Sequence, residues 1–271
     1  MIAAARSSTD TRGVPLAPVD EPAIRVRGVA KTFGGKGGVR ALSAVDFSIR
    51  RGEFVSVLGP SGCGKSTLLR IIAGLVGCDE GGEVDVLGRR QVDVAEDVGV
   101  VFQTHNMLPW LTVEQNLRLA GEVRGIPTRE LDSRVEGLLV VLKLEGFRKR
   151  YPHELSGGMR QRAGLGQILA LRPQVLLLDE PFGALDALTR DQLNIELLRI
   201  WQELQKTVML VTHSISEAVF LSDRVLVMSD RPGHIIEQVE IDLPRPRSTE
   251  TKAIPQFGNT IVHLNETMGV R

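Results

Sequence analysis

One loop constrains this chain more than any other stretch, and it reads Gly59-Pro60-Ser61-Gly62-Cys63-Gly64-Lys65-Ser66-Thr67. It fits the phosphate-binding pattern G-x-x-x-x-G-K-[ST]. Gly62 and Gly64 lack Cβ atoms, so the backbone can curl and direct several N–H groups at one anion. Lys65 can reach the β- and γ-phosphates of a nucleotide, and the Ser66 hydroxyl can bind Mg²⁺. The alternative is an ordinary glycine-rich turn.

The flanks of this loop favour a nucleotide site over an ordinary turn. Residues 53–58 form an apolar run that predicts a buried strand, and residues 66–75 carry apolar side chains at helical spacing. The N-terminus of such a helix directs its partial positive charge at the phosphates. The loop therefore predicts a nucleoside triphosphate site, but it does not say how the energy is used.

Length and charge limit the remaining possibilities. The chain has 271 residues, enough for one large domain or two modest ones. Its 33 basic and 33 acidic residues give zero formal net charge, which argues against a nucleic-acid partner. No apolar run approaches the length of a membrane span. The N-terminus has no signal-peptide core, and residues 1–22 are expected to form a flexible tail.

Cysteine and histidine usage indicates neither disulfides nor a histidine metal site. Cys63 lies inside the loop, where a disulfide would obstruct a nucleotide, so Cys63 and Cys78 are expected to be free thiols in a reducing cytosol. The position of Cys63 near a helix N-terminus favours its thiolate, so we expect a reactive cysteine that ATP would protect. The five histidines show no metal-ligand spacing.

The order of the remaining elements predicts an α/β core with a helical insertion. Apolar patterns predict strands at 24–29, 45–49, 81–88 and 97–102 before the insertion, and at 175–178, 208–211 and 225–228 after it. Helices are predicted at about 187–205 and 214–221, and this alternation of strands and helices is typical of a parallel sheet. Residues 112–170 have helical spacing, with Thr112 and Gln115 as a capping box. The chain beyond Pro244 is polar and is expected to be irregular.

Two further elements carry chemistry. The strand at 175–178 ends in Asp179 and Glu180, which could hold the water shell of Mg²⁺ and activate an attacking water. A solvated acidic turn is the alternative. Ser156-Gly157-Gly158 begins a helix and forms a second anion-binding element, unless it is a plain N-cap. Both phosphate-binding elements can contact one nucleotide only from opposite sides.

These motifs, in this order, resemble the ATP-binding cassette (ABC) ATPases over about residues 23–243. The matching residues are the loop at 59–67, Gln103, Leu155-Ser156-Gly157-Gly158-Met159-Arg160-Gln161, Asp179-Glu180, Ala184-Leu185-Asp186 and Thr212-His213. The resemblance implies a P-loop NTPase (RecA-like) α/β core with an N-terminal antiparallel β subdomain and an inserted α-helical subdomain. The core would comprise 23–103 and 171–243, the insertion 104–170, and the C-terminal tail 244–271.

The resemblance also implies a role for each matching residue. Gln103 would sense Mg²⁺ and the attacking water, His213 would contact the γ-phosphate, and Asp186 would cross a dimer interface. Phe33 would stack on adenine; its alternative is a core residue of the N-terminal sheet. The expected catalytic residues are Glu180, His213 and Gln103; the metal ligands are Ser66, Gln103 and Asp179; the nucleotide-binding residues are Phe33, Gly59, Pro60, Ser61, Gly62, Cys63, Gly64, Lys65, Ser66, Thr67, Ser156, Gly157, Gly158 and Asp186.

Two segments are similar to nitrate/sulfonate/taurine importer ATPases: residues 108–113, with Leu108-Pro109-Trp110, and the turn Arg231-Pro232-Gly233. This similarity implies coupling of ATP hydrolysis to uptake of a small anion through a separate membrane permease. The chain would act as a dimer, with a second copy or a paralogue, on the cytoplasmic face of the inner membrane. A periplasmic or lipid-anchored binding protein would be an indirect partner. Met107, Leu108 and Trp110 would either dock the permease or form the core of the insertion.

Two other functions and one departure from the family remain to be weighed. A cassette ATPase acting on DNA or the ribosome would usually carry long coiled coils or a second cassette, and neither is visible. A small GTPase or kinase would leave Ser156-Gly157-Gly158 unexplained. Where the family often reads Ala-Arg-Ala, this chain has Gly166-Gln167-Ile168, and Gly164 and Gly166 lower the propensity of that helix.

Overall fold

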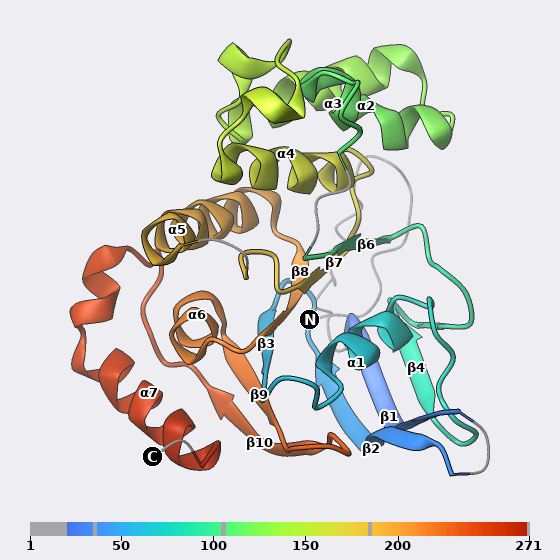
Figure 1. Cartoon of the computed structure of the whole chain (residues 1–271), viewed down its shortest axis with the longest axis vertical. Helices are drawn as coiled ribbons and strands as arrows, with labels where there is room; N and C mark the ends of the chain where they lie inside the picture. Colours follow the sequence, from blue (N-terminus) through green and yellow to red (C-terminus); the bar gives the residue numbers. More distant parts are fainter. Residues whose placement is uncertain (1–20, 35–36, 104–106, 184–185, 270–271) are drawn as a thin grey trace, which may run out of the picture.

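The centre of the computed structural model is a six-stranded sheet (Figure 1). The structure describes residues 21–34, 37–103, 107–183 and 186–269, so most of the predicted N-terminal tail lies outside it. The strand order is β10-β9-β3-β8-β7-β6, with all neighbours parallel except the antiparallel pair β9 and β10. The strands are β3 (Phe54–Leu58), β6 (Val98–Val101), β7 (Val175–Asp179), β8 (Thr207–Thr212), β9 (Arg224–Met228) and β10 (Ile235–Glu240).

A second, antiparallel sheet confirms the predicted N-terminal β subdomain. Its order is β2-β1-β4-β5. Two of its strands are longer than predicted, because their outer halves continue the ladder with half-exposed residues that break the apolar alternation. The bounds are β1 (Ile24–Phe33), β2 (Val39–Ile49), β4 (Glu83–Val86) and β5 (Arg89–Arg90).

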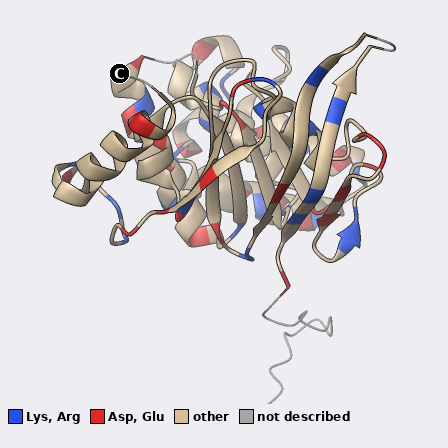
Figure 2. Cartoon of the chain, turned by 90° about the horizontal axis from the view of Figure 1, so that it is seen from below, with Lys and Arg blue, Asp and Glu red and all other residues tan. Residues whose placement is uncertain are grey.

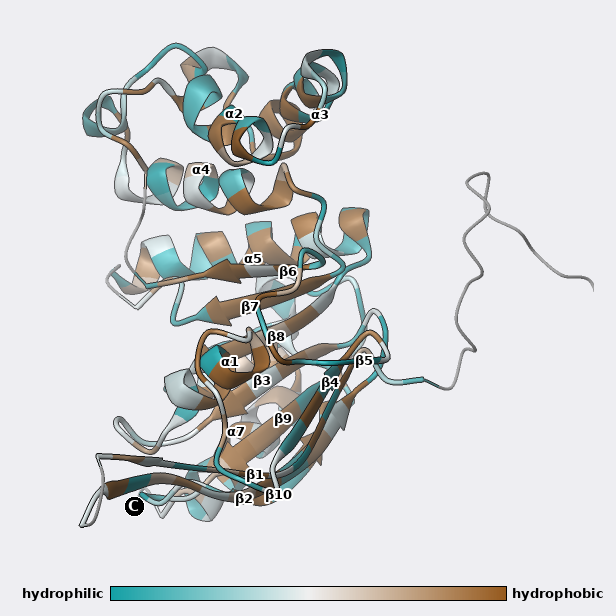
Figure 3. Cartoon of the chain, turned by 90° about the vertical axis from the view of Figure 1, so that its right-hand side faces the viewer, coloured by the Kyte–Doolittle hydropathy of each residue, from teal (hydrophilic) through white to brown (hydrophobic). Residues whose placement is uncertain are grey.

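Apolar residues form a separate core on each face of the six-stranded sheet. One core lies between the two sheets and includes Leu68 and Ile72 of α1 (Lys65–Ile72). The other packs α5 (Ala187–Leu204) and α6 (Ile215–Leu221) and continues into the helical insertion. Figure 3 shows the hydrophobic residues concentrated in the central strands. Burial on both faces explains why these strands read as continuous apolar runs.

The helical subdomain lies at one end of the molecule (Figure 1). It contains α2 (Val113–Val123), α3 (Thr128–Val141) and α4 (Gly157–Leu169), with short 3₁₀ turns at Glu145–Phe147 and Pro152–Glu154. The predicted capping box of Thr112 and Gln115 is present at the start of α2.

Close packing explains the departure from the family pattern in α4. A Cβ atom at Gly166 would lie 2.7 Å from Leu142 Cδ1 and 3.1 Å from Leu117 Cγ. The glycine therefore lets α4 approach α2 and the end of α3 more closely than alanine would. The neighbouring Gln167 amide donates a hydrogen bond of 3.2 Å to Asn116 Oδ1, which joins α4 to α2.

The C-terminal segment corrects the expectation of an irregular tail. A 3₁₀ turn at Thr249–Ala253 leads into α7 (Pro255–Thr267), which packs on α6. The helix is hard to see in the sequence because only Phe257 and Leu264 are buried. Arg247, 5 % exposed, anchors the segment by donating hydrogen bonds of 2.7–3.2 Å to the carbonyls of Val219, Phe220 and Ser222.

Charged residues of both signs are mixed on the surface (Figure 2). Figure 2 shows basic and acidic residues interspersed over the face seen from below. Within the described ranges, no helix combines the length and the apolar character needed to cross a membrane.

Candidate nucleotide site

Functional side chains gather at the carboxyl ends of the parallel strands. The order β9-β3-β8-β7-β6 places the turn at 229–233, the loop at 59–64, His213, Glu180 and Gln103 along one edge of the sheet. Ligands of open α/β sheets bind at this edge. Residues that lie far apart in sequence are thus brought to one edge of the sheet by the strand order.

The phosphate loop has the curled backbone that its glycines predict. Gly62 and Gly64 adopt φ of 79° and 112°, in the region that favours glycine. A Cβ at Gly64 would lie 2.8 Å from the Ala41 carbonyl. Lys65 is buried, and its Nζ donates hydrogen bonds of 2.7 and 2.8 Å to the carbonyls of Gly59 and Pro60. The ammonium group is therefore held against the loop.

A pocket of about 200 Å³ opens over this loop. Helix α1 begins at Lys65, so its free N–H groups point towards the pocket. The lining comprises Ser61, Gly62, Gly64, Lys65, Ser66, Thr67, Glu180 and Arg231. Of the predicted loop residues, Gly59, Pro60 and Cys63 do not line the pocket.

Ser66 and Asp179 supply a pair of oxygen donors suited to Mg²⁺. The Ser66 hydroxyl donates a 2.7 Å hydrogen bond to Asp179 Oδ1, although the two residues are 113 positions apart. Mg²⁺ prefers oxygen ligands and usually takes only one or two carboxylates together with substrate phosphates. No cluster of three or more His, Cys, Asp or Glu that could hold a metal occurs among the described residues. The donor set therefore fits a magnesium ion held partly by a nucleotide.

Glu180 is directed at the pocket by an unusual backbone conformation. Its φ is 45°, in the left-handed region, and its N–H donates to the Val211 carbonyl at 3.0 Å. His213 Nδ1 lies 3.1 Å from Glu180 Oε1, and both side chains are partly open to solvent. A carboxylate beside an imidazole can accept a proton from water.

Thr212 and Glu217 form a buried hydrogen-bonded pair next to His213. The Thr212 hydroxyl hydrogen-bonds to Glu217 of α6, and burial raises the pKa of the Glu217 carboxyl. Thr212 Oγ1 also accepts the N–H of Ser214 at 3.0 Å. These contacts fix the backbone on both sides of His213.

Gln103 lies close to Glu180. A Cβ on Gly183 would be 3.2 Å from Gln103 Nε2 and 3.4 Å from Glu180 Oε2. Both side chains therefore border the same glycine. The residues that follow, 104–106, are outside the described ranges.

Ser156, Gly157 and Gly158 line a different pocket, of about 400 Å³. Ser156 caps α4 by accepting the N–H of Met159 at 3.3 Å, so the N-cap interpretation is correct as local geometry. The same pocket includes Asp186, whose carboxylate accepts the Thr189 N–H at 3.0 Å; this hydrogen bond lowers the Asp186 pKa. Ala184 and Leu185 lie outside the described residues.

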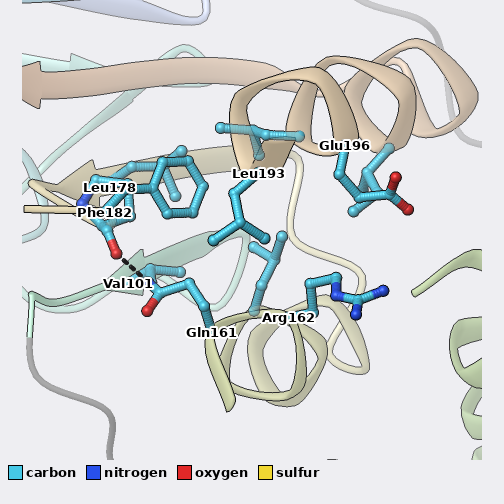
Figure 4. Close-up of a pocket in the computed structure, with 11 residues that line it drawn as sticks. Val101, Gln161, Arg162, Leu178, Phe182, Leu193 and Glu196 are labelled. Carbon is cyan, nitrogen blue, oxygen red and sulfur yellow. Dashed lines mark hydrogen bonds between the residues drawn. The ribbon is translucent and has the colours of Figure 1, made fainter. Parts of the chain in front are cut away.

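Helix α4 is joined to the strand end that carries Glu180. The Gln161 side-chain amide donates to the Pro181 carbonyl, one residue after Glu180. Figure 4 shows Gln161 and Arg162 of α4 facing Leu178, Phe182 and Leu193 across a small pocket. This contact was not expected from sequence, where Gln161 counted only as part of a motif.

The exposure of two aromatic side chains excludes the alternative that they are core residues. Phe33 is 46 % exposed and Trp110 is 68 % exposed, so neither belongs to a core. Phe33 does not line the phosphate pocket, and Lys31 Nζ lies 5.5 Å from the centre of its ring. Met107, by contrast, is half-buried and packs against the core.

The backbone that carries Trp110 is held by one buried side chain. Asn116 is fully buried; its amide nitrogen donates to the carbonyls of Leu108, Leu111 and Thr112 at 2.9–3.1 Å. Its Oδ1 accepts the N–H of Leu108 at 2.8 Å. The described part of this loop is therefore fixed from both ends.

Cys63 is buried, which argues against the reactive thiol that its position suggested. The side chain is only 1 % exposed, and burial raises the pKa of the thiol. The helix N-terminus and Lys65 favour the thiolate, but the loss of solvent outweighs them.

We therefore expect Cys63 to react slowly with a thiol reagent in the folded chain. Cys78, which is partly exposed, should react first. Ellman's reagent, applied to the native chain and to Cys63→Ala, should show the same single fast reaction. Rapid loss of ATPase activity that disappears in Cys63→Ala would contradict the burial argument.

Comparisons with known proteins agree with this geometry. The family model described as ABC transporter matches residues 42–183. The chain is 42% identical over 248 residues to the aliphatic sulfonates import ATP-binding protein SsuB of Bacillus cereus, covering 91% of this chain and 97% of that protein. It is 46% identical over 242 residues to the taurine import ATP-binding protein TauB of Rhizobium johnstonii, covering 85% and 92%.

A solved structure extends the match to three dimensions. The dimeric post-hydrolysis state of the ATP-binding cassette MJ0796, bound to ADP and Pi, has a TM-score of 0.68 and 34% identity. The match covers 80% of this chain and 98% of that one. The chain therefore belongs to the ABC transporter family and is one of its ATPase cassettes.

Proposed function

We propose that this chain is the ATP-hydrolysing subunit of an importer for small organic anions of the aliphatic sulfonate and taurine class. Two chains bind two ATP molecules between them, and a separate membrane permease carries the cargo. The names of the SsuB and TauB relatives supply the substrate class and the direction of transport. The dimeric cassette supports the pairing of two chains.

One observation carries the dimeric site. The pocket over the phosphate loop and the pocket at Ser156-Gly157-Gly158 have no lining residue in common. A single chain therefore presents two anion-binding elements in separate hollows. Two copies in head-to-tail arrangement would bring the loop of one against the serine and glycines of the other. Each nucleotide would then be enclosed from both sides.

The chemistry follows from the side chains at the loop. Lys65 and the α1 N-terminus bind the phosphates, and Glu180 takes the proton of the attacking water. His213 beside Glu180 contacts the γ-phosphate and orients the carboxylate. Ser66, Asp179 and Gln103 would hold Mg²⁺, which when bound neutralises charge on the β- and γ-phosphates. Phe33 would stack on the adenine.

Binding of ATP across the interface would drive transport by population shift. ATP contacts both chains only in the closed dimer, so it favours that state over the open one. Hydrolysis removes the link, and the dimer reopens. The hydrogen bond between Gln161 and Pro181 would communicate this change to the helical subdomain.

The permease would dock at the exposed Trp110. Large aromatic residues at interface centres commonly contribute 2 kcal/mol or more to binding. We therefore expect Trp110→Ala to weaken the detergent-solubilised complex with the membrane subunit by roughly 10- to 100-fold. ATPase activity of the isolated chain should be retained. Val262→Ala, which truncates an exposed apolar residue on α7, is the matched control.

The same experiment tests the function as a whole. If Trp110→Ala and the control bind the permease equally, the docking surface is wrong. If the chain is recovered on ribosomes or DNA and never with a membrane protein, the importer function is wrong.

A further inference from the structure

The turn after β9 reaches the phosphate pocket. Strand β9 is the parallel neighbour of β3, so its carboxyl end lies beside the phosphate loop. Arg231, three residues beyond β9, is part of the pocket lining together with Ser61, Gly62 and Glu180. It is the only arginine in that lining, and the roles assigned above do not include it.

Close contacts hold this turn against the loop. A Cβ at Gly233 would lie 2.2 Å from the Cys63 carbonyl oxygen, so only glycine allows this approach. The Gly233 N–H donates to Ala41 and its carbonyl accepts from Ser43, both at 2.9 Å. Inside the turn, Ser229 Oγ lies 2.8 Å from both Asp230 O and His234 Nδ1. The backbone that carries Arg231 is therefore fixed relative to the loop.

Among the described residues, no hydrogen bond or ion pair is formed by the Arg231 side chain. Arg224 of β9, by contrast, contacts Glu53 at 3.0 Å. An arginine that lines a phosphate pocket on a backbone held by hydrogen bonds is a charge-assisted donor for phosphate oxygens.

The position of Arg231 in the pocket favours a contact with the terminal phosphate. Glu180 lines the same pocket, and its proposed role places the attacked γ-phosphate next to it. Arg231 lines this pocket together with Glu180 and with Ser61 and Gly62 of the loop.

We propose that Arg231 binds the γ-phosphate of the ATP held by its own chain and so lets the site distinguish ATP from ADP. This assignment rests on the proposed function, because it needs the nucleotide in this pocket. ADP lacks the group that Arg231 contacts, so the arginine adds affinity for ATP alone.

The test compares the dissociation constants of ATP and ADP, with Mg²⁺, for the full-length chain and Arg231→Ala. A charge-assisted hydrogen bond contributes about 1.5–3 kcal/mol. We therefore expect ATP to bind roughly 10- to 100-fold more weakly to Arg231→Ala, while ADP binding changes by less than about 3-fold. Arg231→Lys should recover part of the loss, because it keeps the charge but not the fork of donors.

The matched control is Arg129→Ala, which removes an exposed arginine on α3, away from the sheet. It should leave both constants unchanged. An unchanged ratio of ATP to ADP affinity in Arg231→Ala would overturn the assignment, whether both constants stay the same or both rise equally. If the unmodified chain binds neither nucleotide, the proposed function itself fails, and that outcome is distinct.

Discussion

Glu180→Gln should lower the turnover of ATP by about 10²- to 10⁴-fold, the range expected when a general base is removed. The amide has the same shape as the carboxylate and can still hydrogen-bond to His213, but it cannot accept the proton of the attacking water. ATP should still bind, because the loop and Lys65 are unchanged. The closed dimer would then persist, so the variant should elute as a dimer with ATP and as a monomer with ADP.

Glu145→Gln is the control for this experiment, since Glu145 is exposed on a 3₁₀ turn of the helical subdomain. It should leave turnover and elution unchanged. A Glu180→Gln chain that stays monomeric with ATP and Mg²⁺ would contradict the shared site. Near-normal turnover would show that another group is the base.

Gly158→Asp should abolish hydrolysis while the isolated chain still binds ATP. The new carboxylate would face the γ-phosphate carried by the other chain, and like charges in a closed, water-poor interface repel strongly. The fold should tolerate the side chain, because a Cβ at Gly158 meets Leu193 and Thr189 at an ordinary 3.7 Å. The test is to measure ATP turnover and the ATP dissociation constant of Gly158→Asp separately.

Gly158→Ala is the matched control, since it adds the same Cβ without charge. It should keep much of the activity. If Gly158→Asp instead weakens ATP binding by the isolated chain, then the serine and glycines contact the nucleotide in their own chain, and the dimeric site is wrong.

Local patterns predicted the parts of the fold and site that depend on neighbours in sequence. A few adjacent residues determine each of these features: the loop at 59–67, the strands formed by apolar runs and the cap at Thr112. Glu180 was predicted because it follows a strand of a parallel sheet, and the ends of such strands share one functional edge. His213 was expected only from the family resemblance. The family resemblance supplied the fold class, but the strand order was not predicted.

Features that depend on tertiary packing could not be read in the same way. The rule for a helix N-terminus predicted a reactive Cys63, but burial reverses the effect on its pKa. Helix α7 was missed because its sequence buries few apolar residues and its anchor, Arg247, is a polar residue. The proximity of Arg231 to the loop depends on β9 lying beside β3, which local periodicity does not reveal.

The hydrogen bonds of Asn116 have a consequence for the affinity of complex formation. A flexible loop that becomes ordered on binding loses conformational entropy, about 0.5–1.5 kcal/mol for each immobilised side chain. Asn116 holds the backbone from Leu108 to Thr112 with several hydrogen bonds before any partner arrives. A subunit that docks on Trp110 therefore meets a preorganised surface. The entropy of ordering this loop is lost once, during folding, and not at every assembly.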